Sequence, residues 1–282
     1  MSVPHPSDHA GLMAGIVLRV AVLAFVIVGG VRSFRKRAAY NRLLRSYRRG
    51  DYQAALAATE SLRKNGQENR SYCFFRGAMA NELGDSAQAE TCLQKAVLFS
   101  DADKATDDRM RALAHDALGE CLLDAKRYDE ALREFAAALR YWPTHGGTHR
   151  NMAETWLRRG AHADEALKLA RVAADEERTT SPLSADTHRI NLSESLATLA
   201  WAIAAAENDR AKVDANVTEA LKLAPDNSVP TYARVRFYAG NAYASLGDRQ
   251  KGARLFDEAA TRDAQGRWGR ASRTKAAELR GS

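Results

Sequence analysis

Small and apolar residues recur at helical spacing between positions 115 and 143. Gly119 and Leu122 fall on one expected helix, and Ala131 and Phe135 fall on the next. The glycine lets the second helix approach closely, Ala131 is its small counterpart, and the two large side chains fill the remaining space. Pro143 ends the second helix, because its ring cannot continue one. The pattern predicts a pair of packed helices.

The same close-packing position recurs along most of the chain. Residues 43 and 77 are 34 positions apart, and so are residues 119 and 153. Longer intervals contain the insertions 100–108 and 177–186, whose Ser, Thr, Asp and Pro residues indicate loops or extended helix ends. Six positions of this kind indicate six helix pairs: Leu43, Gly77, Gly119, Ala153, Trp201 and Gly240.

The best-defined pair carries a known signature. Leu118-Gly119, Leu122, Ala131, Phe135 and Pro143 match the offsets L-G-x2-Y, A-x3-F and P of the tetratricopeptide pattern, although His115 stands in place of its Trp and Leu122 in place of its Tyr. The chain therefore resembles the tetratricopeptide-repeat (TPR) family. The resemblance implies an all-α protein, a TPR-type α-solenoid of about six helix-turn-helix repeats over residues 38–266.

A solenoid also needs a terminal helix to cover its last apolar surface. Residues 267–282 are expected to form this capping helix, with Trp268 and Leu279 packed inward. Its basic residues are expected to face water: Arg270, Arg273, Lys275 and Arg280.

A mostly apolar run, residues 10–31, precedes the repeats and contains one charge, Arg19. At about 1.5 Å per residue it spans roughly 33 Å, which predicts a transmembrane helix. Basic residues follow it directly, whereas residues 1–9 hold one formal charge, an acid. The positive-inside rule therefore predicts a single-pass protein of the cell membrane, with residues 1–9 outside and the repeats in the cytoplasm. The juxtamembrane segment 32–37 is expected to contact anionic lipid headgroups through Arg32, Arg35, Lys36 and Arg37.

A cleaved signal peptide is the competing interpretation of the same segment. Residues 20–28 would form its apolar core and residues 28–30 its small-residue cleavage site. The product would be a periplasmic or secreted binding module. The basic cluster directly downstream argues against export and favours the uncleaved anchor.

The charge of the chain is concentrated at its N-terminal end. The net charge is +7, but residues 1–50 hold nine Lys or Arg and one acid, so the rest of the chain is close to neutral. A nucleic-acid-binding protein needs basic side chains spread over a folded face, so nucleic acid is not an expected partner. The three cysteines form no C-x-x-C pair and are expected to be buried free thiols.

Motifs of catalytic, nucleotide-binding and metalloenzyme sites are absent from the sequence. His145 and His149 are four positions apart, but Gly146-Gly147 between them indicates a turn rather than a helical metal pair. The prediction is a protein that is not an enzyme and has no cofactor and no metal.

In the TPR family, the first helix of each repeat lines a concave groove that holds peptides or extended protein segments. Aromatic residues mixed with charges of both signs suit a protein ligand with apolar anchors. The resemblance thus implies a membrane-anchored scaffold or adaptor, with a regulatory subunit of a bound enzyme as the alternative. The charged members of the groove are expected to be exposed and to contribute little to stability. The groove residues are Tyr40, Tyr47, Phe74, Asn81, Asp116, Glu120, Arg150, Glu154, Arg234, Phe237 and Asn241.

Overall fold

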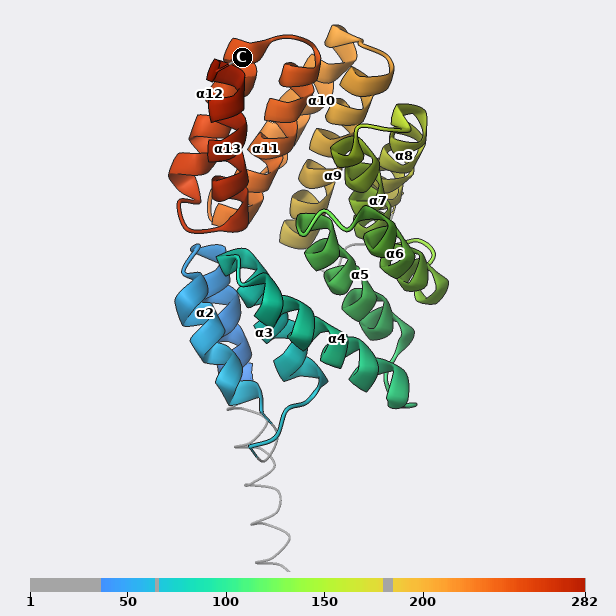
Figure 1. Ribbon diagram of the computed structural model, residues 1–282, viewed down its shortest axis with the longest axis vertical. Helices are drawn as coiled ribbons and strands as arrows, with labels where there is room; N and C mark the ends of the chain where they lie inside the picture. Colours follow the sequence, from blue (N-terminus) through green and yellow to red (C-terminus); the bar gives the residue numbers. More distant parts are fainter. Residues whose placement is uncertain (1–36, 64–65, 180–184, 282) are drawn as a thin grey trace, which may run out of the picture.

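The computed structural model describes residues 37–63, 66–179 and 185–281, and every regular element in these ranges is a helix (Figure 1). The predicted all-α solenoid is therefore confirmed for the described residues. Residues 37–48 are helical and precede α2 (Tyr52–Thr59) and the short 3-10 helix η1 (Glu60–Leu62). The remaining helices are α3 (Arg70–Leu83), α4 (Ser86–Ala102), α5 (Asp108–Asp124), α6 (Tyr128–Tyr141), α7 (Gly146–Arg159), α8 (Ala163–Thr179), α9 (Ala185–Ala206), α10 (Arg210–Leu223), α11 (Val229–Ser245), α12 (Arg249–Arg262) and α13 (Arg267–Gly281).

The helices are arranged as six antiparallel pairs followed by α13. Gly119 on α5 faces the ring of Phe135 on α6, and a Cβ atom at this glycine would lie 2.5 Å from a ring carbon. Gly240 stands in the same relation to Phe256, at 2.7 Å. The glycine position is therefore where the two helices of a pair approach most closely, as the pattern predicts.

The turns within the pairs use a recurring cap. Asp51, Asp85, Asp209 and Asp248 each accept a hydrogen bond from a backbone N–H in the first turn of the second helix. A side-chain oxygen at this position satisfies one of the donors that a helix start leaves unpaired. Short loops of this kind hold the two helices of a pair antiparallel.

The Gly146-Gly147 turn predicted after Pro143 is not present. These glycines begin α7, and Gly146 is buried so closely that a Cβ atom would meet a carboxylate oxygen of Glu177 at 2.7 Å. Packing against α8 favours the helix here over the intrinsic preference of glycine for turns. His145 precedes the helix and stacks on Trp142 with ring centroids 4.3 Å apart, whereas the ring of His149 pairs with Glu176.

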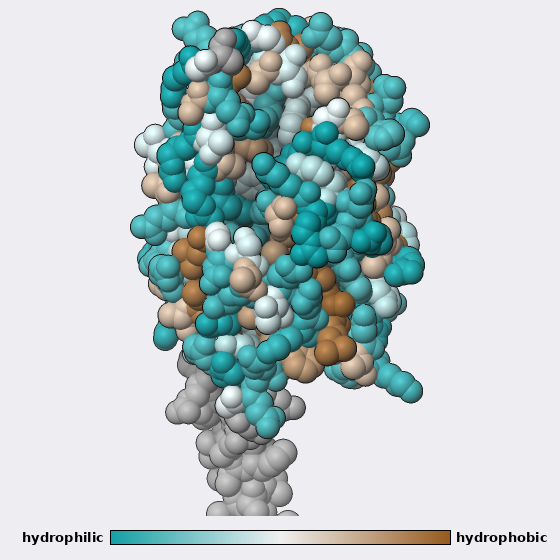
Figure 2. Space-filling view, viewed as in Figure 1, coloured by the Kyte–Doolittle hydropathy of each residue, from teal (hydrophilic) through white to brown (hydrophobic). Residues whose placement is uncertain are grey.

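The largest apolar cluster lies in the C-terminal half. Trp268 on α13 is fully buried, with its ring centroid 5.3 Å from Phe237 and 5.4 Å from Tyr238 on α11. Leu279 on α13 packs against the same cluster. The face of the molecule in Figure 2 carries mostly hydrophilic residues, with hydrophobic residues in separate patches.

The two ends of the array are in contact. In Figure 1, α12 and α13 lie directly above α2 and α3. Tyr52 at the start of α2 donates a buried hydrogen bond to Asp263, which follows α12, at 2.7 Å. Arg270 on α13 donates to the backbone oxygen of Glu82 on α3 at 2.9 Å, so this basic residue of α13 does not simply face water. The solenoid therefore closes on itself around a central axis.

The predicted membrane span, residues 10–31, and the basic residues 32–36 lie outside the described residues. Arg37 is exposed at the first described position. None of the helices in the described ranges combines the length and the apolar character needed to cross a bilayer. The N-terminal span therefore stays a prediction.

Candidate functional site

Charged side chains form stripes along two neighbouring helices. On α5, Glu120 and Asp124 continue from Asp116 at four-residue spacing, and on α7 the matching stripe is Arg150, Glu154 and Arg158. Residues four apart lie one above the other on the same helix face. Because α5 and α7 are the first helices of successive pairs, both stripes face the central axis.

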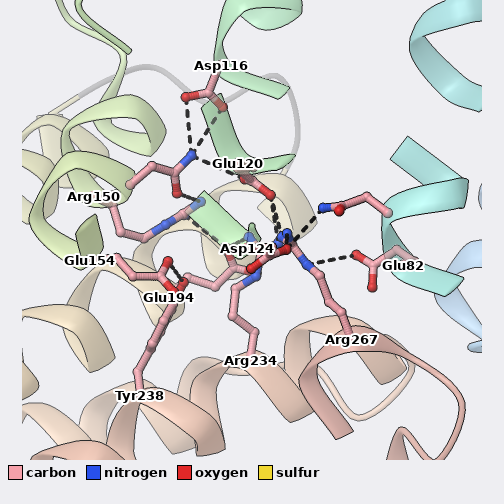
Figure 3. Close-up of polar contacts among 12 residues, drawn as sticks. Glu82, Asp116, Glu120, Asp124, Arg150, Glu154, Glu194, Arg234, Tyr238 and Arg267 are labelled. Atoms are coloured by element: carbon pink, nitrogen blue, oxygen red, sulfur yellow. Dashed lines mark hydrogen bonds and ion pairs between the residues drawn. The ribbon is translucent and has the colours of Figure 1, made fainter. Parts of the chain in front are cut away.

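Further charges from the other first helices and from α13 complete a buried cluster, which we call the axial network (Figure 3). It contains six carboxylates and four guanidiniums. Its members are Glu82, Asp116, Glu120, Asp124, Arg150, Glu154, Arg158, Glu194, Arg234 and Arg267.

Arg267 connects the end of the array to its beginning. Its guanidinium pairs with Glu120 and with Asp124, the latter at 2.6 Å, and its Nε lies 3.5 Å from a carboxylate oxygen of Glu82. Burial alone disfavours the charged guanidinium, but the surrounding carboxylates outweigh it and raise the pKa of Arg267. This side chain therefore fills the axis at the level of α3 and α5.

A second group of pairs lies on the other side of the axis. Glu194 on α9 accepts from both Arg150 and Arg234, each at 2.9 Å. Tyr238 donates to Glu154 at 2.6 Å. These contacts tie α7, α9 and α11 together through charged groups in place of an open groove.

Next to the network is a cavity of about 240 Å³, which we call the axial hollow. Its walls come from the helical residues 37–48, from α3 and α4, from α5 and from the two arginines opposite. It is lined by Leu43, Leu44, Tyr47, Phe74, Phe75, Ala78, Met79, Asn81, Glu82, Leu93, Leu113, Asp116, Ala117, Glu120, Arg234 and Arg267.

The carboxylates around the axial hollow differ in the direction of their pKa shifts. Burial is the largest effect on Glu82 and raises its pKa to about 7, because Arg267 and Arg234 compensate only partly. Burial and the charge of Glu120 likewise raise the pKa of Asp116. Burial opposes ionisation of Glu120 too, but the guanidiniums of Arg267 and Arg234 outweigh it and lower the pKa of that carboxyl.

The structure brings six of the predicted groove residues around the axial hollow. These are Tyr47, Phe74, Asn81, Asp116, Glu120 and Arg234. Phe237 and Asn241 line a separate cavity of about 580 Å³ on the other side of Arg267, and Tyr40 lies on the outer surface with 41% of its area exposed. The eleven residues thus do not share a single continuous groove.

One expectation about these residues is wrong. The charged ones were expected to be exposed, but Arg150 is 5% exposed and Glu154 is 2% exposed, and both are paired within the axial network. Closure of the solenoid removes them from water. Because an unpaired buried charge is costly, their replacement is expected to destabilise the fold strongly.

The sequence reasoning did not identify five members of the network. Asp124 and Arg158 could have been predicted, since each extends by one helical turn a series of charged residues spaced four positions apart. Glu194 and Glu82 sit on first helices without such a stripe. Arg267 has no local signal at all, because it lies 147 positions from Glu120 in the sequence. The missed residues are Glu82, Asp124, Arg158, Glu194 and Arg267.

Comparison with known proteins supports the repeat assignment. No family model matches the chain. A segment of 103 residues is 34% identical to human tetratricopeptide repeat protein 16, a match that covers 34% of this chain and 11% of that relative. The sequence similarity therefore spans only a small part of the relative's length.

Solved structures resemble the whole array more broadly. A Rap protein complexed with competence and sporulation factor is similar with a TM-score of 0.59 and 12% identity, over 86% of this chain and 74% of that one. A thermophilic TPR protein from Thermus thermophilus has a TM-score of 0.49 and 16% identity, over 74% of this chain and 98% of that one. The chain is thus similar to the Rap protein in its helical fold, and the described residues form an α-solenoid of helix pairs, part of whose sequence is similar to a tetratricopeptide repeat protein.

Proposed function

We propose that this protein is a non-enzymatic adaptor that binds a segment of a partner protein in the axial hollow. The observation that carries the proposal is the gathering of six predicted groove residues, from several repeats, around one cavity. The anchor residues of a protein ligand typically bind in pockets that combine aromatic walls with buried charged groups. A protein of the same fold has been crystallised in complex with competence and sporulation factor, which agrees with a binding role.

The chemistry around the hollow favours binding over catalysis. In the part of the chain that the structure describes, no serine, cysteine or histidine lines the hollow. Most carboxylates and guanidiniums there pair with one another. A nucleophile with an adjacent base is the arrangement that covalent catalysis needs. The proposed activity is therefore recognition.

The proposal includes attachment to the membrane through residues 10–31, with the repeats in the cytoplasm. The length of the apolar run and the basic residues that follow it support this placement. The axial hollow would then hold a cytoplasmic segment of a partner close to the bilayer. The same array released by signal cleavage would bind its partner outside the cytoplasm instead.

The test fills the hollow without altering the helices. Ala78 on α3 lines the cavity, and leucine is nearly as good a helix former as alanine. Ala87→Leu on the exposed face of α4 is the matched control. Affinity purification from detergent extract with mass spectrometry should show that Ala78→Leu loses partners that the parent and Ala87→Leu retain. Equal partner sets for all three proteins, at equal melting temperatures, would overturn the proposal.

A further inference from the structure

The axial network contains more acids than bases. Its six carboxylates face four guanidiniums, which leaves two carboxylates without a positive charge of their own. Buried charges in proteins are normally paired, because an isolated one loses its hydration without compensation. The excess therefore requires an explanation.

The contacts identify which two carboxylates are left over. Glu120, Asp124, Glu154 and Glu194 each lie within 3.0 Å of a guanidinium nitrogen. Among the described residues, the donors to Asp116 are neutral: the hydroxyl of Thr148 and the amide of Asn151.

Glu82 is the less satisfied of the two. Its nearest guanidinium nitrogen is 3.5 Å away, and its second oxygen, Oε2, has no partner within the part of the chain that the structure describes, although the residue is only 4% exposed. Figure 3 shows one oxygen of Glu82 directed to Arg267 and the other directed away from it. A buried acceptor without a donor is rare in native proteins, so Oε2 of Glu82 is open to a donor from a ligand.

Both carboxylates line the axial hollow, and the other walls are largely apolar. Phe74, Phe75 and Met79 come from α3, and Leu113 comes from α5. The cavity of about 240 Å³ exceeds the roughly 150 Å³ that accommodates benzene in an engineered core, so it accommodates one large side chain of a bound partner segment. Aromatic faces and a carboxylate are both favourable neighbours for a cation on an alkyl stem.

We propose that the axial hollow selects a primary ammonium group, that of a lysine side chain of the partner, with the nitrogen donating to Glu82 Oε2. This specificity rests on the proposed function, because it names the chemistry of the residue that the partner inserts. The alkyl stem lies against the apolar walls, and its charge balances one of the two carboxylates left over.

An anion is disfavoured at this position. Arg234 and Arg267 also line the hollow, but both are held by carboxylates of the network. Three carboxylates against two guanidiniums line the cavity, which leaves its wall negative when all are ionised. A small carboxylate is therefore the appropriate opposing probe.

Binding of an ammonium group is expected to depend on pH. Ionisation of Glu82 is required, and because burial raises its pKa to about 7, the ionised fraction rises about tenfold between pH 6 and pH 8. Affinity should rise by a similar factor over that range. The charged and titratable groups that face Glu82 from the surrounding elements are Tyr47, Tyr52, Glu120, Arg234, Asp263, Arg267 and Arg270.

The direct test uses n-butylammonium as a lysine side-chain probe on the purified full chain, read out by thermal unfolding at constant ionic strength. At ten times its Kd the probe should raise the melting temperature by about 3–5 °C in the parent. The same rise is expected in Glu219→Gln, a neutralised exposed glutamate on α10, and none in Glu82→Gln. An equal rise in Glu82→Gln, or a larger one with n-butanol or n-butyrate, would contradict the proposal.

A second arm separates this specificity from the proposed function. Glu82→Gln is carried through the same affinity purification as Ala78→Leu. Loss of partners in both variants supports a lysine in the hollow. Loss in Ala78→Leu alone leaves the binding role standing and refutes the role of Glu82. If Ala78→Leu retains every partner, the binding role fails, and the butylammonium titration decides the ammonium site by itself.

Discussion

At the scale of single residues, the main feature is that charged side chains, rather than apolar ones, pack along the central axis. Arg267 has a side chain only 10% exposed and contacts carboxylates from both α3 and α5. Removing one partner from a buried ion pair leaves an uncompensated charge, whereas an exposed pair contributes little. Whether a charged side chain is buried or exposed therefore matters more for the free energy of unfolding than the sign of its charge.

The first prediction concerns this arginine. Arg267→Ala should lower the free energy of unfolding by about 3–5 kcal/mol, because Glu120 and Asp124 lose a buried partner. Urea unfolding monitored by circular dichroism provides the measurement. The control is Arg254→Ala, whose side chain is 82% exposed and which should change stability by less than about 0.5 kcal/mol. Equal effects of the two substitutions would show that the axis is hydrated.

The second prediction follows from the raised pKa of Glu82, which is about 7 against an ordinary value of 4.5. The folded state holds this proton more tightly than the unfolded state, so stability is lost as pH rises from 4.5 to 7. Glu82→Gln avoids that loss. Relative to the parent it should gain about 2–3 kcal/mol between pH 5 and pH 7.5, at about 1.4 kcal/mol per pKa unit.

Urea unfolding of both proteins at several pH values measures this gain. Glu219→Gln, which neutralises an exposed glutamate on α10, is the matched control. A gain for Glu82→Gln that does not change with pH would mean that Glu82 ionises normally in the folded protein.

At the scale of helices, the sequence was sufficient to predict the pairs and their register. Gly119 and Phe135 are 16 positions apart, and so are Gly240 and Phe256, so one contact repeats with one geometry. Local signals of this kind arise because each pair packs mainly against itself and its neighbours. Where a helix end depends on tertiary packing, as at Gly146, the local pattern predicted a turn and was wrong.

The third prediction tests the close approach of α5 and α6. Gly119→Leu should destabilise the protein by about 1–3 kcal/mol, because even the Cβ atom would lie 2.5 Å from the ring of Phe135. Ala87→Leu adds comparable bulk on an exposed helix face and should change stability by less than about 0.5 kcal/mol. Thermal and urea unfolding measure the stability of both variants. Equal melting temperatures for Gly119→Leu and Ala87→Leu would show that the predicted repeat register is wrong.

At the scale of the whole molecule, closure of the array was not predictable. The hydrogen bond between Tyr52 and Asp263 joins residues 211 positions apart, and a local sequence pattern does not predict a contact of that kind. Small rotations between successive repeats determine the curvature of a solenoid. These rotations add up along the array, so whether its two ends meet depends on the packing between every pair of successive repeats. Six of the predicted groove residues line the axial hollow, but the burial of the charged residues around it could not be predicted.

The fourth prediction concerns the placement of the array in the cell. If residues 10–31 span the bilayer, the protein should remain in the membrane fraction through high-salt and carbonate washes. Protease added to intact cells or spheroplasts should leave the repeats undigested, because the basic residues that follow the span favour the cytoplasmic side. Digestion of the repeats from outside would reverse the orientation, and release by carbonate would refute the anchor.

The last prediction is the most direct test of the axial hollow as the binding site. Phe74 lines the hollow, whereas Val172 on α8 has 41% of its area exposed elsewhere on the surface. The photoreactive residue p-benzoylphenylalanine is placed at one position or the other in the full chain, and cells are irradiated before purification. Position 74 should form covalent adducts with a partner protein, identified by mass spectrometry, and position 172 should not. Adducts from position 172 with none from position 74 would place binding on the outer surface and contradict a partner segment in the axial hollow.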